Sequence, residues 1–245
     1  MIKTILCFGF LIIAMILLVP FGLAAGFLYL LGLRKPMRHF IYFLAKMWAL
    51  SIIKISRSKI TVKGSENIPK KGSVCFISNH CGYFDIILLL AYCGRPFGFI
   101  AKKELIFVPF LNIWIHLLNG LFIDRTNIRK AIGTIKEGVK RIKAGGGMII
   151  FPEGHRSKGR GLLPFHPGSL KLATMADAPI IPVAIEGSYG IFEKNMRVES
   201  VPVKIAFLEP VNTADLPPGD RKQALCDKIY SVISEELADG NEREE

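Results

Sequence analysis

The sequence predicts an α/β fold, a mostly parallel sheet flanked by helices, with an N-terminal two-helix motif that anchors the chain to a membrane. Three observations lead to this prediction. Residues 5–33 carry no charge, short β-branched segments alternate with helical segments after residue 58, and polar residues follow several predicted strands. Alternating strands and helices are typical of a parallel sheet covered on its faces. We therefore expect an anchor over residues 1–57 and an α/β domain over residues 58–245.

The first apolar run is longer than the ~20 residues needed to cross a bilayer. It also exceeds the ~7 to 15 apolar residues of a cleaved signal peptide, so we expect the run to be retained. Pro20, followed by Phe21 and Gly22, is expected to break the run because proline removes a helical hydrogen bond. Insertion into one leaflet is then favoured over a single crossing.

A second helix, expected over residues 36–57, combines a basic stripe with a broad aromatic and aliphatic face. The stripe repeats at steps of three, four or eight residues and contains Lys35, His39, Tyr42, Lys46, Lys54 and Arg57. Such a helix lies in the plane of an anionic membrane surface. We expect a monotopic protein at the cytoplasmic face of the cell membrane, and two buried helices of a soluble bundle are the alternative.

The positive charge is concentrated near the N-terminus. The chain has 245 residues and a net charge of +12, and nine basic residues precede Glu66, the first acidic one. The remainder is close to neutral, which argues against a nucleic-acid-binding domain. Five cysteines form no C-x-x-C pair, and three lie in apolar runs, which favours a reduced domain that faces the cytosol.

Short strands are expected wherever β-branched residues alternate or cluster between turn residues. They cover residues 59–63, 74–78, 98–102, 121–124, 148–151, 180–185 and 203–207. Helices are expected over residues 86–92, 128–142 and 221–237. The middle helix has isoleucine or valine at steps of three and four, and three glycines follow it, which is typical of an amphipathic helix and its C-terminus.

Polar clusters follow four of these strands, where parallel sheets bind ligands. They read SNHCGYFD, AKKE, LFIDR and FPEGHRS. In the first, Gly82 permits a turn that brings Asp85 to His80. The carboxylate would keep one imidazole nitrogen protonated and leave the other as a general base. A structural or capping role for the pair is the alternative.

Other chemistries are poorly supported by the spacing of the polar residues. His80, Asp85, Glu153, His155 and His166 include no H-x-x-x-H pair, so we expect no metal site. No G-x-S-x-G elbow or cysteine-enzyme signature is present. The cations at strand ends, Lys103, Arg125 and Arg156, are suited to a phosphate group, although each alone is more often a solvated charge.

Together these motifs resemble those of the glycerolipid acyltransferases, in particular the 1-acylglycerol-3-phosphate acyltransferases. The resemblance rests on NHCGYFD, GLFIDR, FPEGHRS and IPV in this order and spans roughly residues 58–210. Two positions depart from the family pattern. Gly82 stands where serine is common, and His155 stands where threonine is usual.

The resemblance implies transfer of a fatty acyl group from a thioester to the sn-2 hydroxyl of lysophosphatidic acid, giving phosphatidic acid without an acyl-enzyme. His80 would be the general base and Asp85 its orienting partner. The implied substrate-binding residues are Asn79, Lys103 (with Lys102 as the alternative), Arg125, Glu153, Gly154 and Arg156. Arg125 and Arg156 would hold the phosphate, and Glu153 and Gly154 would shape the glycerol site. No bound cofactor is implied, and the acyl donor would be acyl-acyl carrier protein or acyl-coenzyme A.

The expected partners are therefore lysophosphatidic acid, the carrier of the acyl thioester and an anionic membrane surface, and not nucleic acid. A cationic, anchored protein would meet this anionic amphiphile within the membrane plane. Acylation of a different lysophospholipid is the first alternative. A membrane-bound, metal-dependent phosphoesterase that uses His80, Asp85 and Glu153 is the second.

Overall fold

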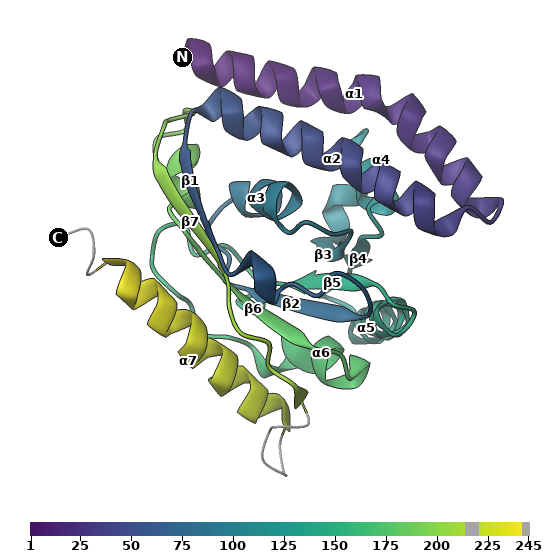
Figure 1. The fold of residues 1–245 in the computed structure, drawn as a ribbon, viewed down its shortest axis with the longest axis vertical. Coiled ribbons are helices and arrows are strands. Elements are labelled where there is room, and N and C mark those ends of the chain that lie inside the picture. Colours follow the sequence, from purple (N-terminus) through teal and green to yellow (C-terminus); the bar gives the residue numbers. More distant parts are fainter. Residues whose placement is uncertain (214–220, 242–245) are drawn as a thin grey trace.

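A seven-stranded sheet organises the chain, with helices on both of its faces (Figure 1). The computed structural model describes residues 1–213 and 221–241. The strand order is β1-β7-β6-β2-β5-β3-β4, and every neighbouring pair is parallel except β6 and β7. The strands are β1 (Lys59–Lys63), β2 (Val74–Ser78), β3 (Gly98–Lys102), β4 (Leu121–Ile123), β5 (Gly147–Ile150), β6 (Ile180–Glu186) and β7 (Pro202–Phe207). The predicted α/β class with a mostly parallel sheet is confirmed.

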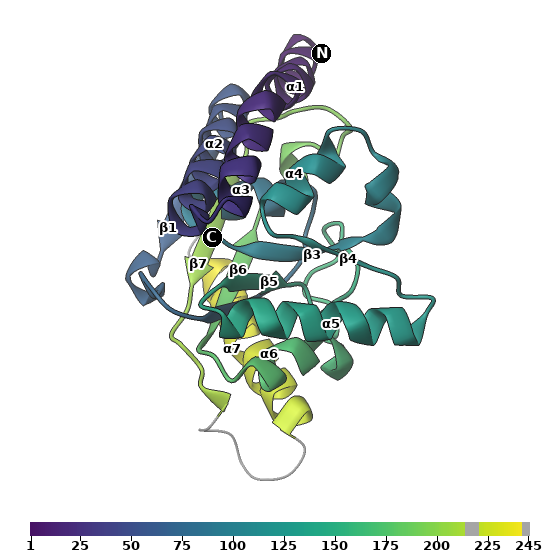
Figure 2. The same cartoon turned by 90° about the vertical axis from the view of Figure 1, so that its right-hand side faces the viewer.

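The helices divide between the two faces of the sheet (Figures 1 and 2). One face carries α1 (Ile2–Leu30), α2 (Arg34–Ser56), α3 (Phe84–Tyr92) and α4 (Leu111–Leu117). The other carries α5 (Ile128–Lys143), α6 (Lys171–Ala176) and α7 (Arg221–Asn241). Each face has its own hydrophobic cluster. The central strand β2 is buried at every position, because helices cover it on both sides.

β1 connects the two N-terminal helices to the functional edge of the sheet, which is the edge where β2, β5 and β6 end and the predicted polar clusters follow. β1 and β7 run antiparallel to the other five strands. β1 therefore starts at the edge where β2, β5 and β6 end. Because α2 ends at Ser56 and β1 starts at Lys59, the second helix delivers the chain directly to that edge.

The long amphipathic helix α5 forms as its sequence predicts. The side chain of Asn127 caps its N-terminus by accepting from the amide of Lys130 at 3.1 Å. Gly145, at φ +85°, follows its C-terminus, where a left-handed conformation favours glycine. The short helices α4 and α6 were not predicted, because one or two turns show too little periodicity to be distinguished from loops.

The expected break at Pro20 is wrong, because α1 is one continuous helix from Ile2 to Leu30. Proline is tolerated inside a long apolar helix when neighbouring helices support it. Here α1 packs along α2 and against α4. A Cβ atom at Gly22 would lie 2.7 Å from Cδ1 of Leu117 in α4, so this glycine allows α1 to approach α4 closely.

The second helix differs from its predicted pattern at one position. Tyr42, assigned to the basic stripe, is buried and its hydroxyl donates to the carbonyl of Leu90 at 3.2 Å. Tyr42 therefore packs against α3 and does not belong to the exposed basic stripe. Phe40, Phe43 and Met47 remain exposed on the outer side.

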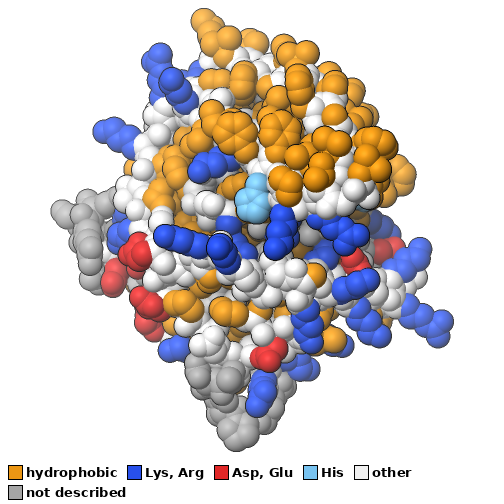
Figure 3. All heavy atoms as spheres, turned by 45° about the vertical axis from the view of Figure 1, so that its right-hand side comes forward, with side chains coloured by type: hydrophobic (Ala, Val, Ile, Leu, Met, Phe, Trp, Pro, Cys, Tyr) orange, Lys and Arg blue, Asp and Glu red, His pale blue; other side chains and the backbone are white. Residues whose placement is uncertain are grey.

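Both N-terminal helices are long and apolar enough to cross a membrane, by length and composition. Only 11% of the most apolar window of α1 is buried, against 39% for α2. Hydrophobic side chains gather over the end of the molecule formed by α1, α2 and α4, and Lys and Arg side chains border this surface (Figure 3). A contiguous exposed apolar surface bordered by polar side chains is typical of membrane association.

Candidate active site

The turn after β2 brings His80 and Asp85 together at the functional edge. Nδ1 of His80 lies 2.7 Å from Oδ2 of Asp85, and the amide of Gly82 donates to the same oxygen at 3.0 Å. Asp85 is fully buried in the first turn of α3, while the His80 side chain is 20% exposed. A buried carboxylate thus fixes the ring on one side and leaves Nε2 as the nitrogen available to a substrate.

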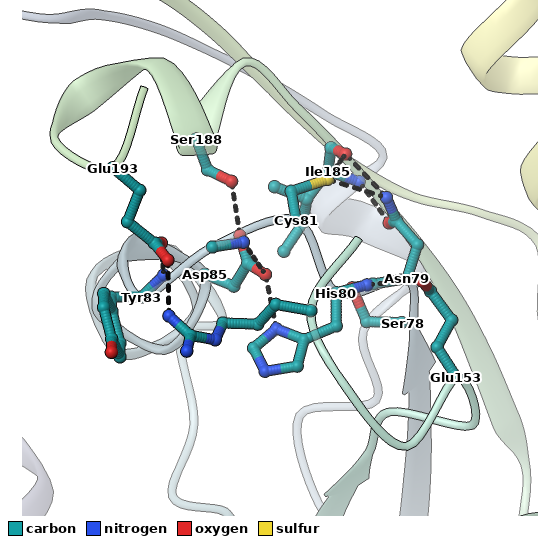
Figure 4. Close-up of polar contacts among 12 residues, drawn as sticks. Ser78, Asn79, His80, Cys81, Tyr83, Asp85, Glu153, Ile185, Ser188 and Glu193 are labelled. Atoms are coloured by element: carbon teal, nitrogen blue, oxygen red, sulfur yellow. Dashed lines mark hydrogen bonds and ion pairs between the residues drawn. The ribbon is translucent and has the colours of Figure 1, made fainter. Parts of the chain in front are cut away.

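Ser188 completes this arrangement, and the sequence analysis did not include it. Its hydroxyl donates to Oδ1 of Asp85 (Figure 4). Ser188 is buried and lies two residues beyond β6, after Gly187 at φ +81°. Both Asp85 oxygens therefore accept hydrogen bonds from buried or backbone donors. The available signal was the EGSYG sequence after a predicted strand, the same position rule that identified the other clusters.

The FPEGHRS segment supports His80 from the opposite side. The His80 amide donates to Oε1 of Glu153 at 2.7 Å, and the imidazole stacks on Phe151 at 4.1 Å between ring centroids. The amide of Ser157 donates to the His80 carbonyl at 2.7 Å. The pKa of Glu153 is raised to about 7, mainly by burial and to a smaller extent by the charge of Asp85, although hydrogen bonds from the backbone of His80 and Leu163 act to lower it. Glu153 therefore contacts the backbone of the proposed base.

Asn79 joins the turn to β6. Its Nδ2 donates to the Ile185 carbonyl at 2.8 Å, and its Oδ1 accepts from the Ile185 amide at 2.8 Å (Figure 4). Nδ2 also donates to Sγ of Cys81 at 3.2 Å. Nδ2 and Oδ1 of this buried side chain are thus both bonded within the protein, and Asn79 supports the turn. Its role in substrate binding stays a prediction.

Each of the two predicted arginines is held by an internal acceptor. Nη1 of Arg125 donates to the carbonyl of Gly154, which has a φ of +74°. Nη1 of Arg156 donates to Oε1 of Glu193, and its guanidinium lies 3.7 Å from the ring centroid of Tyr83. Each arginine retains further N–H groups that can bind a phosphate.

The hydrogen bonds of Lys103 are made with residues after β4 and not with His80 or Asp85. Its Nζ is 2.8 Å from Oδ1 of Asp124 and 3.2 Å from the hydroxyl of Thr126, both just beyond β4. Hydrogen bonds from Lys103 and Thr126 hold the pKa of Asp124 well below its usual range. Lys102, the alternative to Lys103 as a substrate-binding residue, is exposed, and its Nζ lies 3.7 Å from Oε2 of Glu104.

An apolar cavity of about 520 Å³ adjoins this site. Its wall includes Tyr83 and Phe84. In the sequence, these two residues lie between His80 and Asp85, where the turn leads into α3. The remaining wall comes from α1, α2, α3, the α4 region and Phe192, with Phe8, Leu11, Met15, Trp48, Ile87 and Trp114 among the lining residues. The arrangement combines a histidine held by a buried carboxylate, two arginines and an apolar cavity, which suits an amphiphile with an anionic head.

Comparison with known proteins decides the family. The family described as Acyltransferase matches residues 59–186, just over half of the chain. The chain belongs to this acyltransferase family. All strands except β7 begin within the matched segment, and it includes His80, Asp85, Arg125 and the FPEGHRS motif.

Named relatives of this chain agree with the family match. A 1-acyl-sn-glycerol-3-phosphate acyltransferase of Borreliella burgdorferi is 35% identical over 142 residues, 58% of this chain and 57% of the relative. The protein of that name from Escherichia coli K12 is 31% identical over 182 residues, 74% of each chain. The chain matches little more than half the length of the first curated relatives, 57% for Borreliella and 53% for Cocos nucifera.

A solved structure resembles this chain over nearly its full length. The crystal structure of the 1-acyl-sn-glycerophosphate (LPA) acyltransferase, PlsC, from Thermotoga maritima gives a TM-score of 0.82 at 26% identity. The similarity covers 98% of this chain and 97% of that chain. It therefore includes α1 and α2, which the family match leaves out.

Proposed function

We propose that this protein transfers a fatty acyl group from an acyl thioester to the sn-2 hydroxyl of 1-acylglycerol-3-phosphate, forming phosphatidic acid. The observation that carries the proposal is the His80–Asp85 pair, 2.7 Å apart, beside both an apolar cavity and Arg156. The names of the relatives support the same substrate. The acyl donor would be acyl-coenzyme A or acyl-acyl carrier protein, with no bound cofactor.

The geometry supports a direct transfer. Nε2 of His80 takes the proton from the sn-2 hydroxyl while the oxygen attacks the thioester carbonyl. The tetrahedral intermediate then expels the thiolate, which receives the proton from the imidazolium as a thiol. Asp85 keeps Nδ1 protonated and stabilises the imidazolium between these two steps.

The phosphate and the acyl chain of lysophosphatidic acid fit the two arginines and the apolar cavity, respectively. Its phosphate would bind Arg125 and Arg156, since guanidinium groups bind phosphate through paired N–H donors. An acyl chain would enter the apolar cavity, where each buried methylene contributes roughly 0.8 kcal/mol. These two contacts would fix the glycerol hydroxyl near His80.

An assay with purified protein tests this proposal. Lysophosphatidic acid is supplied with acyl-coenzyme A or acyl-acyl carrier protein, and phosphatidic acid is measured by mass spectrometry. We expect product from lysophosphatidic acid and much lower rates with lysophosphatidylcholine, because its phosphate is a diester with one charge. Equal rates with both acceptors would favour the alternative, an acyltransferase for another lysophospholipid.

A metal-dependent phosphoesterase is not favoured. Among the described residues, no group of three or more His, Cys, Asp and Glu side chains is arranged to hold a metal ion. His80, Asp85 and Glu153, proposed as ligands for that reaction, instead bond to one another or to the backbone. Hydrolysis that a chelator abolishes would revive this alternative.

The substitution Arg125→Ala is expected to raise the KM for lysophosphatidic acid by roughly tenfold, because a charge-assisted hydrogen bond contributes about 1.5 to 3 kcal/mol. The KM for the thioester should not change. Steady-state rates with each substrate varied in turn measure both values. Arg129→Ala is the matched control, since Arg129 is also exposed but has no contact with Gly154. A change confined to the thioester would instead assign Arg125 to the donor.

We further propose that α1 and α2 insert into one leaflet at the cytoplasmic face of the membrane. Nζ of Lys3 donates to Oγ of Ser200 at 2.8 Å, and the amide of Val198 donates to Oγ1 of Thr4 at 2.9 Å. These contacts attach the N-terminus of α1 to the segment before β7. A spanning α1 would separate these partners across the bilayer, so the contacts support insertion without crossing.

Cysteine labelling in sealed vesicles tests this topology. We expect Ile2→Cys, an exposed position, to react with a membrane-impermeant maleimide on the same side as Glu66→Cys, which marks the catalytic domain. Four of the five native cysteines are buried, so background labelling can be subtracted with the unsubstituted protein. Reaction of Ile2→Cys only from the opposite side would show a true span.

A further inference from the structure

Gly82 leaves a space that the carboxylate of Glu193 fills. A Cβ atom at Gly82 would lie 2.6 Å from Oε2 of Glu193 and 3.2 Å from Cα of Tyr189. Gly82 does not have a positive φ, so space and not backbone conformation makes glycine necessary here. The departure from the family pattern at this position is therefore matched by a carboxylate that comes from a segment beyond β6.

The Glu193 side chain is committed to two partners beside the site (Figure 4). Its Oε2 accepts from the amide of Tyr83 at 2.5 Å, and its Oε1 accepts from Nη1 of Arg156. The Glu193 side chain is only 9% exposed, so water screens this pair weakly. The Tyr83 ring covers the guanidinium on one face. Arg156 is thus held by an internal anion in the position where the proposed function requires it to meet a phosphate.

We propose that Glu193 competes with the acceptor phosphate for Arg156 and so sets the affinity of the site for that phosphate. This inference rests on the proposed function of Arg156. A carboxylate and a phosphate both bind the guanidinium fork, and the negative charge of Glu193 repels an incoming phosphate. The repulsion weakens binding of the anionic acceptor. It equally weakens binding of phosphatidic acid, which carries the same phosphate, so the product leaves more readily.

A purely structural role for Glu193 predicts a different result. Its bond to the Tyr83 amide supports the start of α3, and a neutral glutamine can accept the same bond. Glu193→Gln therefore keeps the shape and the acceptor while it removes the charge. Only a role in phosphate binding predicts a change in affinity for an anion.

The decisive measurement is the binding of glycerol 3-phosphate to the full-length protein in detergent micelles by isothermal titration calorimetry. We expect Glu193→Gln to lower the Kd roughly tenfold, since one unit charge near a partly buried site contributes on this scale. Glu199→Gln is the matched control, because Glu199 pairs with Arg197 in the same segment but lies outside the site. An unchanged or higher Kd in Glu193→Gln, or no binding by either protein, overturns the inference.

A second variant tests whether Glu193 acts through Arg156. In an Arg156→Gln background, Glu193→Gln should give a clearly smaller gain in affinity, because only the direct repulsion is then removed, and a gain of similar size there would also overturn the inference. Binding does not require turnover, so the two proposals can fail separately. Tighter glycerol 3-phosphate binding without phosphatidic acid formation by the wild type would reject the acyltransferase reaction alone. Phosphatidic acid formation with an unchanged Kd would reject the role of Glu193 alone.

Discussion

Replacing His80 with alanine is expected to lower turnover by roughly 100- to 10,000-fold, the range for loss of a general base, while the protein still folds. The fold should survive because Asp85 keeps its bonds from Gly82 and Ser188. The substitution also removes the stacking of His80 on Phe151. Because the His80 side chain is already partly exposed, this loss should cost little stability. Phosphatidic acid formation measures the turnover, and circular dichroism with thermal unfolding checks the fold.

His116→Ala is the matched control for this substitution. His116 lies on α4 and contacts Phe122 at 5.1 Å between ring centroids, away from the proposed catalytic turn. It should keep wild-type turnover. Activity of His80→Ala within a few-fold of the wild type would end the proposed mechanism.

Asp85→Asn is expected to lower turnover by on the order of 100-fold or more with a small change in stability. The Ser188 hydroxyl can accept as well as donate a hydrogen bond. The new amide group can therefore point at Ser188 while its oxygen still accepts from His80 and Gly82. The imidazole keeps its orientation, and only the charge that stabilises the imidazolium is lost.

Comparison with Asp85→Ala separates the charge from the hydrogen bonds. Alanine leaves the buried donors of Ser188 and Gly82 without an acceptor, at a cost of about 1 to 3 kcal/mol each. We expect Asp85→Ala to lower Tm by several degrees more than Asp85→Asn, as measured by thermal unfolding. Near-normal turnover in Asp85→Asn would show that the carboxylate charge is not needed.

The fold was predictable where local pattern and tertiary environment agree. β2 is apolar throughout because both of its faces are covered, and α5 shows its buried stripe because one face meets the sheet. The prediction failed at Pro20, where packing against α2 and α4 outweighs the local tendency to break. It also failed at Tyr42, whose hydroxyl finds a buried carbonyl that no spacing rule reveals.

The candidate site was predictable as far as it follows from the ends of parallel strands. That rule brought together the turn of His80 and the FPEGHRS segment, which the structure joins through Glu153. Ser188 was missed although EGSYG follows a predicted strand. Glu193 was missed because it lies beyond that strand end and its partner Tyr83 is 110 residues away in the sequence. Nor could the rule show that the side-chain amide of Asn79 bonds to Ile185 and Cys81.

The shared wall of the apolar cavity limits how modular this protein can be. Phe8, Leu11 and Met15 of α1 and Trp48 of α2 line the same space as Phe84 and Ile87 of α3. An exchange of residues 1–57 for the matching helices of a relative would thus replace part of the wall of this cavity. On the function proposed above, such a chimera would change its bilayer affinity and its chain-length selectivity together.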